Sequence, residues 1–205
     1  MKVAIIDFGM GNLRSVEKAF HKIGATGAFV TDDPREVASA DKAVLPGDGA
    51  FDSTMRSLRL SGVDEIALEF IASGRPFLGI CVGMQALLTS SEEGEPGVKG
   101  LDVVPGWVRR FPTGAGRKIP QIGWNNIAFA PGSPLGADLP GHDPMAYFLH
   151  SYYCQPDDPA DVAAVTEYGV TYCSALHRGN VWATQFHPEK SGPVGLAILR
   201  NFARL

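Results

Sequence analysis

The sequence predicts an α/β fold in which a mostly parallel central sheet is flanked by helices, with an added antiparallel region in the second half. Over residues 1–90, short apolar runs rich in β-branched side chains alternate with segments of helical periodicity, an order typical of a parallel sheet covered on both faces. Beyond residue 100, strand-like runs follow one another almost without helices, which favours antiparallel pairing. The length of 205 residues predicts a single domain, 1–205.

The elements of the first half are predicted from apolar spacing and from the residues that end each segment. In the first helical segment the apolar positions recur every three or four residues and stop at Gly24, and a second such segment stops at Gly74. We expect strands at residues 2–6, 28–30, 42–45 and 76–80, and helices at 13–23, 63–73 and 84–88.

The second half is predicted to be mainly β-structure closed by one helix. Gly179-Asn180 suits a two-residue hairpin turn between the last two predicted strands. We expect strands at residues 103–111, 118–129, 146–154, 162–168, 171–176 and 181–186, and a closing helix at 193–204.

Composition and charge exclude several classes of protein. The net charge is −4 and no basic run is present, which argues against a non-specific nucleic-acid binder. No apolar stretch approaches the ~20 residues of a membrane span, and the apolar run at residues 3–6 reaches Asp7 too soon for a signal peptide. Three cysteines in a chain of this length argue against a disulfide scaffold. We therefore expect a cytoplasmic protein in which Cys154 and Cys173 are neither catalytic nor bridged.

Motifs for nucleotides and metals are missing from the sequence. Arg14 stands where a dinucleotide fingerprint beginning at Gly9 would need its third glycine, and no Gly-Lys-Ser/Thr occurs. There is no Cys-x-x-Cys, and the five histidines lack metal-ligand spacing. We expect neither a cofactor nor a metal.

Gly79-Ile80-Cys81-Val82-Gly83 lies between a predicted strand and a predicted helix and has the form of a nucleophile elbow with cysteine as the nucleophile. The two glycines allow a sharp turn around Cys81. The helix that follows directs its positive N-terminal end at the sulfur, which favours the thiolate. The motif and its setting favour a nucleophile, and the alternative is that Cys81 is a small buried apolar residue.

His187-Pro188-Glu189 follows the last predicted strand and supplies that partner. In an extended chain, residues i and i+2 point to the same side about 6.6 Å apart, so Glu189 can reach the ring of His187 and hold its tautomer. By itself this tripeptide indicates little more than a histidine at a strand end. Together with the cysteine elbow it predicts a Cys81-His187-Glu189 triad for acyl transfer.

These two motifs, with Met84 and Gln85 after the elbow, resemble the class I glutamine amidotransferase family. Further segments narrow the resemblance to the glutaminase subunits of imidazole glycerol phosphate synthase, over the whole chain. They are Gly9-Met10-Gly11-Asn12, Pro46-Gly47-Asp48-Gly49-Ala50-Phe51, Gly123-Trp124-Asn125, Tyr147-Phe148-Leu149-His150-Ser151-Tyr152 and His187-Pro188-Glu189-Lys190.

The resemblance implies a flavodoxin-like amidotransferase fold and a two-subunit enzyme of histidine biosynthesis. This chain would hydrolyse glutamine to glutamate and ammonia without a cofactor. The ammonia would pass to a (β/α)8-barrel cyclase partner in a heterodimer. The cyclase would convert a phosphoribulosyl aminoimidazole carboxamide ribonucleotide to imidazole glycerol phosphate and aminoimidazole carboxamide ribotide.

Roles for single residues follow from the resemblance and from the chemistry of acyl transfer. The oxyanion is expected to meet the backbone of Val82 and of the loop Gly47, Asp48 and Gly49, because glycines allow unusual peptide orientations. Asp48 departs from the family, in which this loop commonly reads Pro-Gly-Val-Gly, and its carboxylate would oppose a nearby oxyanion unless it pointed to solvent. Substrate binding is implied for Gly49, Gln85, His150, Ser151 and Tyr152, and partner contact for Asn12, Trp124, Tyr147 and Lys190.

Three other interpretations remain open at this point. A stand-alone cysteine hydrolase or peptidase of related fold would turn over peptides or esters without a partner. A binding subunit with a vestigial triad is disfavoured because Cys81, His187 and Glu189 are all present. The glutaminase of another amidotransferase, serving anthranilate or pyridoxal phosphate synthesis, is disfavoured by Lys190 and the Gly-Trp-Asn segment.

Overall fold

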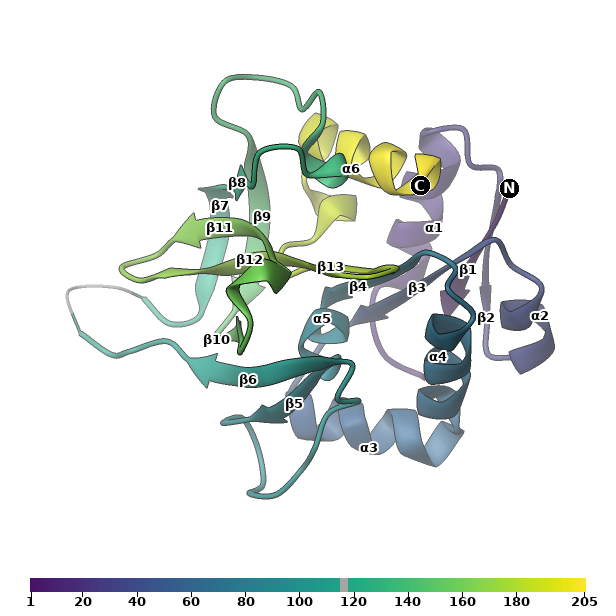
Figure 1. The fold of residues 1–205 in the computed structure, drawn as a ribbon, viewed down its shortest axis with the longest axis horizontal. Helices are drawn as coiled ribbons and strands as arrows, with labels where there is room; N and C mark the ends of the chain where they lie inside the picture. The colour runs from purple at the N-terminus through teal and green to yellow at the C-terminus, as the bar shows by residue number, and fades with distance from the viewer. Residues whose placement is uncertain (115–117) are drawn as a thin grey trace.

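A large mixed sheet runs through the molecule between two layers of helices (Figure 1). The structure is a computed structural model that describes residues 1–114 and 118–205. In these ranges eleven strands form the main sheet, and its central path is, in order, β2 (Gly27–Thr31), β1 (Lys2–Ile6), β3 (Lys42–Gly47), β4 (Phe77–Cys81), β13 (Val181–Thr184), β12 (Thr171–Arg178), β10 (Tyr152–Pro156), β6 (Val104–Arg110) and β5 (Leu88–Ser91).

The sheet is parallel from β2 to β13 and antiparallel from β13 to β6. β11 (Val162–Glu167) pairs with β12 and with β8 (Ala128–Phe129). Arg178 is paired with Val181, so a two-residue turn joins β12 to β13 as predicted. The observed sheet therefore confirms the prediction of a mostly parallel core extended by antiparallel strands from the second half.

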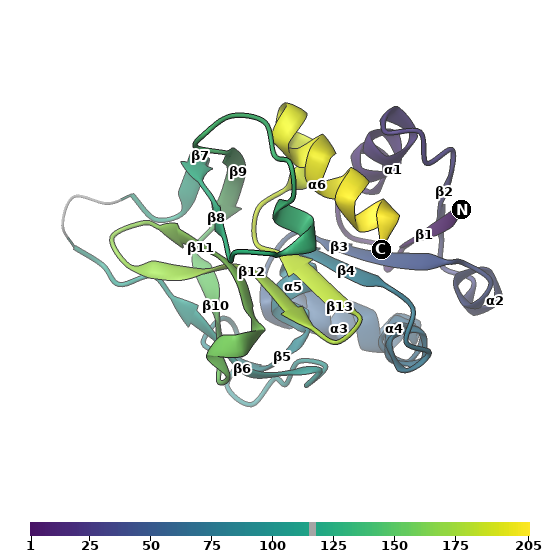
Figure 2. The same cartoon turned by 45° about the horizontal axis from the view of Figure 1, so that its top comes forward.

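Both faces of the inner parallel strands β1, β3, β4 and β13 are buried. In β1, Val3 and Ile5 pack toward one layer and Ala4 and Ile6 toward the other, the alternation that a pleated strand imposes. The first layer contains α1 (Leu13–Lys22) and α6 (Gly192–Arg204), and the second contains α2 (Pro34–Ala38), α3 (Phe51–Ser61) and α4 (Val63–Ala72) (Figure 2). Each layer thus closes one half of the core.

A separate two-stranded sheet, β7 (Gln121–Asn126) with β9 (Met145–His150), stands beside the antiparallel end. Its inner face carries Ala146 and Phe148, which are fully buried. Its outer face leaves large apolar side chains in solvent, namely Ile122, Trp124, Met145 and Leu149. Three short 3-10 turns complete the elements of the described residues: η1 (Pro134–Gly136), η2 (Pro159–Asp161) and η3 (Pro188–Lys190).

Several predicted boundaries are wrong. The helix expected at 84–88 is α5 (Val82–Ala86), and Leu88 begins β5 instead. The runs 118–129 and 146–154 each split in two, because β7 and β9 pair with each other while β8 and β10 join the main sheet. Helices α2 and α3 were not predicted. The start of α3 is capped by the Glu93 carboxylate, which accepts a hydrogen bond from the Phe51 N–H across 42 positions of sequence.

The cysteines are all free and buried. Cys154 and Cys173 face each other across β10 and β12 without a disulfide. Burial raises the pKa of both thiols, so neither is a reactive nucleophile. Among the described residues, no helix combines the length and apolar character needed to cross a membrane.

We expect Gly83→Ala to destabilise the protein by about 3 kcal/mol or more, because the new Cβ would overlap the carbonyl oxygen of Leu45 in the core. Gly62→Ala is the matched control. Its φ of 71° disfavours any side chain, but no atom lies within 4 Å of the added methyl group, so the loss should be only about 1 kcal/mol. Urea unfolding of both variants measures the difference, and equal losses would contradict the close-packing argument.

Candidate active site

Cys81 occupies a sharp turn where β4 ends and α5 begins. Its backbone has φ of 56° and ψ of −112°, an unusual conformation for a residue with a side chain. The neighbours leave no alternative to glycine, since a Cβ on Gly79 would lie 2.8 Å from the Gly83 carbonyl oxygen. The predicted elbow turn is therefore present, and its strained backbone places the buried Cys81 side chain at the wall of a pocket.

His187 and Glu189 meet as predicted, although by a different local geometry. Nδ1 of His187 lies 2.9 Å from Oε1 of Glu189, and both side chains are almost completely buried. The extended chain assumed from the sequence is wrong, because Pro188 starts the 3-10 turn η3 directly after His187. The turn brings the carboxylate back to the ring. Since the carboxylate accepts, Nδ1 carries the proton and Nε2 is directed to the other side.

The imidazole faces the cysteine with its free nitrogen. Nε2 of His187 is buried and has no hydrogen-bond partner in the part of the chain that the structure describes. A ring nitrogen of His187, the Cys81 sulfur and a carboxylate oxygen of Asp48 all lie within 4.8 Å of one another. Burial favours the neutral ring, but the contacts with Cys81 and Glu189 outweigh it and raise the pKa of His187 to about 10.

Asp48 points into this site. Its Oδ1 lies 3.9 Å from Nε2 of His187, and the side chain is 40% exposed. The carboxylate is therefore close to the reacting groups in this conformation, where its charge favours an imidazolium and opposes an oxyanion. Gly47 lies beside Cys81 in the parallel register of β3 and β4, so the loop that follows it borders the nucleophile.

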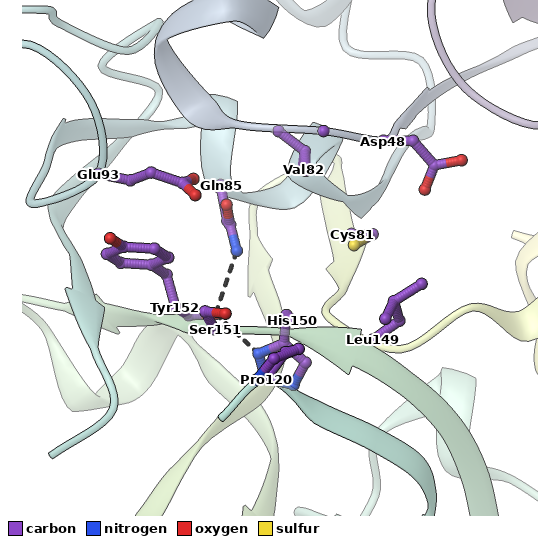
Figure 3. Close-up of a pocket in the computed structure, with 11 residues that line it drawn as sticks. Asp48, Cys81, Val82, Gln85, Glu93, Pro120, Leu149, His150, Ser151 and Tyr152 are labelled. Atoms are coloured by element: carbon purple, nitrogen blue, oxygen red, sulfur yellow. Dashed lines mark hydrogen bonds between the residues drawn. The ribbon is translucent and has the colours of Figure 1, made fainter. Parts of the chain in front are cut away.

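A pocket of about 240 Å3 opens beside the sulfur (Figure 3). In Figure 3, Cys81 and Val82 lie at one end with Asp48, and Gln85 with Tyr152 at the other. The structure brings all the predicted substrate residues to this pocket, and the oxyanion loop borders it. Its lining consists of Asp48, Gly49, Cys81, Val82, Gln85, Glu93, Pro120, Leu149, His150, Ser151 and Tyr152.

Two of the predicted substrate residues are also tied to the protein backbone. The Tyr152 carbonyl oxygen accepts a hydrogen bond from Gln85 Nε2 at 3.2 Å and another from His150 Nδ1 at 2.7 Å. Burial lowers the pKa of His150 to about 4, so its ring is neutral at pH 7. The neutral His150 ring therefore holds the Tyr152 carbonyl group in place beside the pocket.

Sequence reasoning missed two polar residues at the site. Glu93 lines the pocket while its other contact caps α3 at Phe51. Gln185 is fully buried at the end of β13, where it accepts a hydrogen bond from Gln85 and places its Nε2 3.8 Å from the Cys81 sulfur. No local pattern marks either residue, because each reaches the site through pairing of distant segments.

Of the residues predicted to contact a partner, Trp124 and Tyr147 lie on the outer face of the small sheet. Trp124 is 54% exposed and meets the half-buried Tyr147 edge to face, with ring centroids 6.2 Å apart. Lys190 belongs to η3, three residues after the candidate catalytic histidine, and Asn12 is exposed at the start of α1. The Tyr147 carbonyl oxygen accepts the His187 N–H at 3.0 Å. A single backbone hydrogen bond thus connects the strand that carries this face to the candidate catalytic histidine.

The chain resembles known proteins over its full length. The family model for class-I glutamine amidotransferases matches residues 4–205. The imidazole glycerol phosphate synthase subunit HisH of Geobacter sulfurreducens is 51% identical over 209 residues, covering 100% of this chain and 99% of that protein. The HisH subunit of Methanothermobacter thermautotrophicus is 50% identical, covering 99% and 98%. A crystal structure of a glutamine amidotransferase superposes with a TM-score of 0.76 at 19% identity, covering 100% and 98%.

The family-model match over residues 4–205 shows that the chain is a class I glutamine amidotransferase. The solved structure, at 19% identity, supports the fold alone. The full-length identities near 50% to HisH subunits identify the family. The chain belongs to the family of HisH subunits of imidazole glycerol phosphate synthase.

We expect Glu189→Gln to lower the pKa of His187 by at least about one pH unit, because the neutral amide no longer stabilises the imidazolium. Nitrogen NMR of 15N-histidine-labelled protein measures the titration directly. The His150 ring, neutral from pH 6 upward in both proteins, is the internal control. An unchanged His187 titration would contradict the role of Glu189 as its charge partner.

Proposed function

We propose that Cys81, His187 and Glu189 hydrolyse glutamine, as in an imidazole glycerol phosphate synthase, and that the ammonia is used by a (β/α)8-barrel cyclase subunit. The observation that carries this proposal is the elbow cysteine beside a histidine whose Nδ1 is hydrogen-bonded to a buried carboxylate. Family membership supports the same activity, and with it a place in histidine biosynthesis.

The first half of the reaction is formation of a thioester. The Cys81 thiolate attacks the amide carbon of glutamine, and the carbonyl oxygen becomes an oxyanion. The Val82 N–H and the backbone of Gly47–Gly49 are the proposed donors to this oxygen. The raised pKa of His187 keeps the ring protonated at pH 7, so it can pass its Nε2 proton to the departing nitrogen and release ammonia.

The second half is hydrolysis of the thioester. His187, now neutral, removes a proton from water at Nε2, and the hydroxide adds to the acyl carbon. Collapse of this intermediate expels the Cys81 sulfur as thiolate, releases glutamate and restores the imidazolium. Glu189 holds the ring in one orientation throughout, and no cofactor enters either step.

The far end of the pocket suits the charged end of glutamine. The Glu93 carboxylate lines the pocket, and burial raises its pKa, partly offset by the hydrogen bond from the Phe51 N–H. A carboxylate there can bind the substrate ammonium group, while Gln85, Ser151 and Tyr152 offer polar contacts. Glu93 extends the proposed substrate site beyond the residues that the sequence analysis selected.

The outer face of the small sheet is the proposed docking surface for the cyclase. Ile122, Trp124 and Leu149 are exposed apolar side chains on adjacent strands, and Leu149 also lines the catalytic pocket. A partner seated here would cover the pocket rim and keep ammonia from water. Tyr147 contacts Trp124 on this surface, and Lys190 and Asn12 are proposed as further contacts of the cyclase.

We expect Cys81→Ala to abolish glutamine hydrolysis, because alanine fits the turn but lacks the nucleophile. The complex of this variant with the cyclase should still form imidazole glycerol phosphate from ammonium salts, which serves as the folding and binding control. Glutamate release by the loaded complex is the measurement. Turnover above background would refute the assignment of the nucleophile.

We expect Trp124→Ala to weaken cyclase binding by about 10–100-fold, because exposed aromatic anchors carry much of an interface's affinity. Trp107→Ala is the matched control: Trp107 is 40% exposed on β6, outside the small sheet. Calorimetric titration of the cyclase compares them, and equal affinities for the two variants would place the docking surface elsewhere.

A further inference from the structure

The structure assigns a second capability to the catalytic centre: we propose that Cys81, His187 and Asp48 bind a Zn2+-like transition-metal ion, which reversibly blocks glutamine hydrolysis. The metal site depends on geometry alone, whereas the inhibition rests on the proposed function. Sequence spacing could not reveal this site, since its three donors come from three distant segments.

The donor set and its spacing suit zinc. One thiolate, one imidazole and one carboxylate are ligands that Zn2+ accepts together. Zinc–ligand bonds of about 2.0–2.3 Å place tetrahedral donor atoms roughly 3.3–3.6 Å apart. The observed donor atoms lie within 4.8 Å of one another, with 3.9 Å between His187 Nε2 and Asp48 Oδ1. The half-exposed Asp48 side chain can close this gap by a small rotation.

The histidine is already arranged as a metal ligand. Its Nδ1 is hydrogen-bonded to the Glu189 carboxylate at 2.9 Å, the carboxylate–histidine arrangement that supports zinc ligands in proteins. Its Nε2 is buried and unpaired within the described residues, and it faces the sulfur and Asp48. The same nitrogen that the proposed reaction uses is therefore in position to bind a metal ion between Cys81 and Asp48.

The proton balance of metal binding is simple. The Cys81-His187 pair holds one proton, either on sulfur or on Nε2, and the metal-bound pair holds none. One proton is therefore released for each ion bound. The positive charge of the ion takes the place of the proton's charge between Asp48 and the thiolate. The pocket beside Cys81 leaves room for water as a fourth ligand.

Inhibition follows because the reaction needs the same two atoms. A metal-bound sulfur is not free to attack the amide carbon, and a metal-bound Nε2 carries no proton for the departing ammonia. Asp48 is what distinguishes this loop from the Pro-Gly-Val-Gly form, in which an apolar side chain offers no third donor. The proposed metal sensitivity therefore depends on the aspartate at position 48.

Co2+ binding to the full chain tests the site, because a thiolate ligand gives cobalt an intense near-ultraviolet charge-transfer band. We expect the band in the wild-type protein, its displacement by Zn2+ and its loss in Cys81→Ser. Asp48→Asn should weaken Co2+ binding by at least about 10-fold. Glu93→Gln removes a carboxylate from the same pocket outside the donor set and should bind Co2+ within twofold of wild type. A band that survives Cys81→Ser, or equal affinity in Asp48→Asn, would overturn the proposal.

A second measurement avoids dependence on folding of the cysteine variant. Zn2+ should slow alkylation of Cys81 in the wild-type chain, detected by mass spectrometry, and a chelator should restore it. In the cyclase complex, Zn2+ should suppress glutamate release and the chelator should recover it. Unhindered alkylation at saturating Zn2+ would overturn the site, and full activity of the metal-bound complex would overturn the inhibition. If the complex lacks glutaminase activity altogether while the cobalt band is present, the proposed function fails and the metal site stands.

Discussion

The catalytic centre depends on one steric constraint: the backbones of β3 and the elbow after β4 pack against each other without side chains between them. A Cβ on Gly47 would lie 2.7 Å from the backbone nitrogen of Gly83, and a Cβ on Gly83 would overlap the Leu45 carbonyl oxygen. This contact holds Cys81 in its strained turn and holds the following loop beside the sulfur. The proposed positions of the nucleophile and of the oxyanion donors both require this close approach of the Gly47 and Gly83 backbones.

Charge at the centre is arranged around a single ring. Glu189 is buried, and within the described residues one of its oxygens, Oε2, has no hydrogen-bond partner, so its other oxygen's contact with His187 is the main compensation for its charge. The same carboxylate therefore explains the tautomer and the orientation of the ring, and together with Cys81 it raises the pKa of His187. Asp48 adds a second negative charge on the opposite nitrogen. At 3.9 Å from Nε2, its charge favours an imidazolium and opposes a nearby oxyanion.

The small sheet connects the surface to this centre. Strand β9 exposes Leu149 at the pocket rim, accepts the His187 N–H at Tyr147, and binds Ser191 through the Tyr147 N–H. Ser191 in turn donates to the His187 carbonyl oxygen at 2.6 Å. A protein docked on the outer face would thus contact strand β9. This strand is hydrogen-bonded to the His187 N–H directly and to the His187 carbonyl oxygen through Ser191.

Local signals along the chain were enough to predict the α/β class, the parallel arrangement of the first strands, the hairpin at Gly179-Asn180 and the three residues of the proposed triad. Those signals are apolar periodicity, turn-forming residues, and glycines on both sides of a cysteine. Folding in three dimensions set how the runs at 118–129 and 146–154 divide between two sheets, and it brought Glu93, Gln185 and the Asp48 carboxylate together around the pocket of Cys81. Such convergence depends on which distant strands pair and in which register, and hydrogen bonds across 42 or 104 positions leave no periodic trace along the chain.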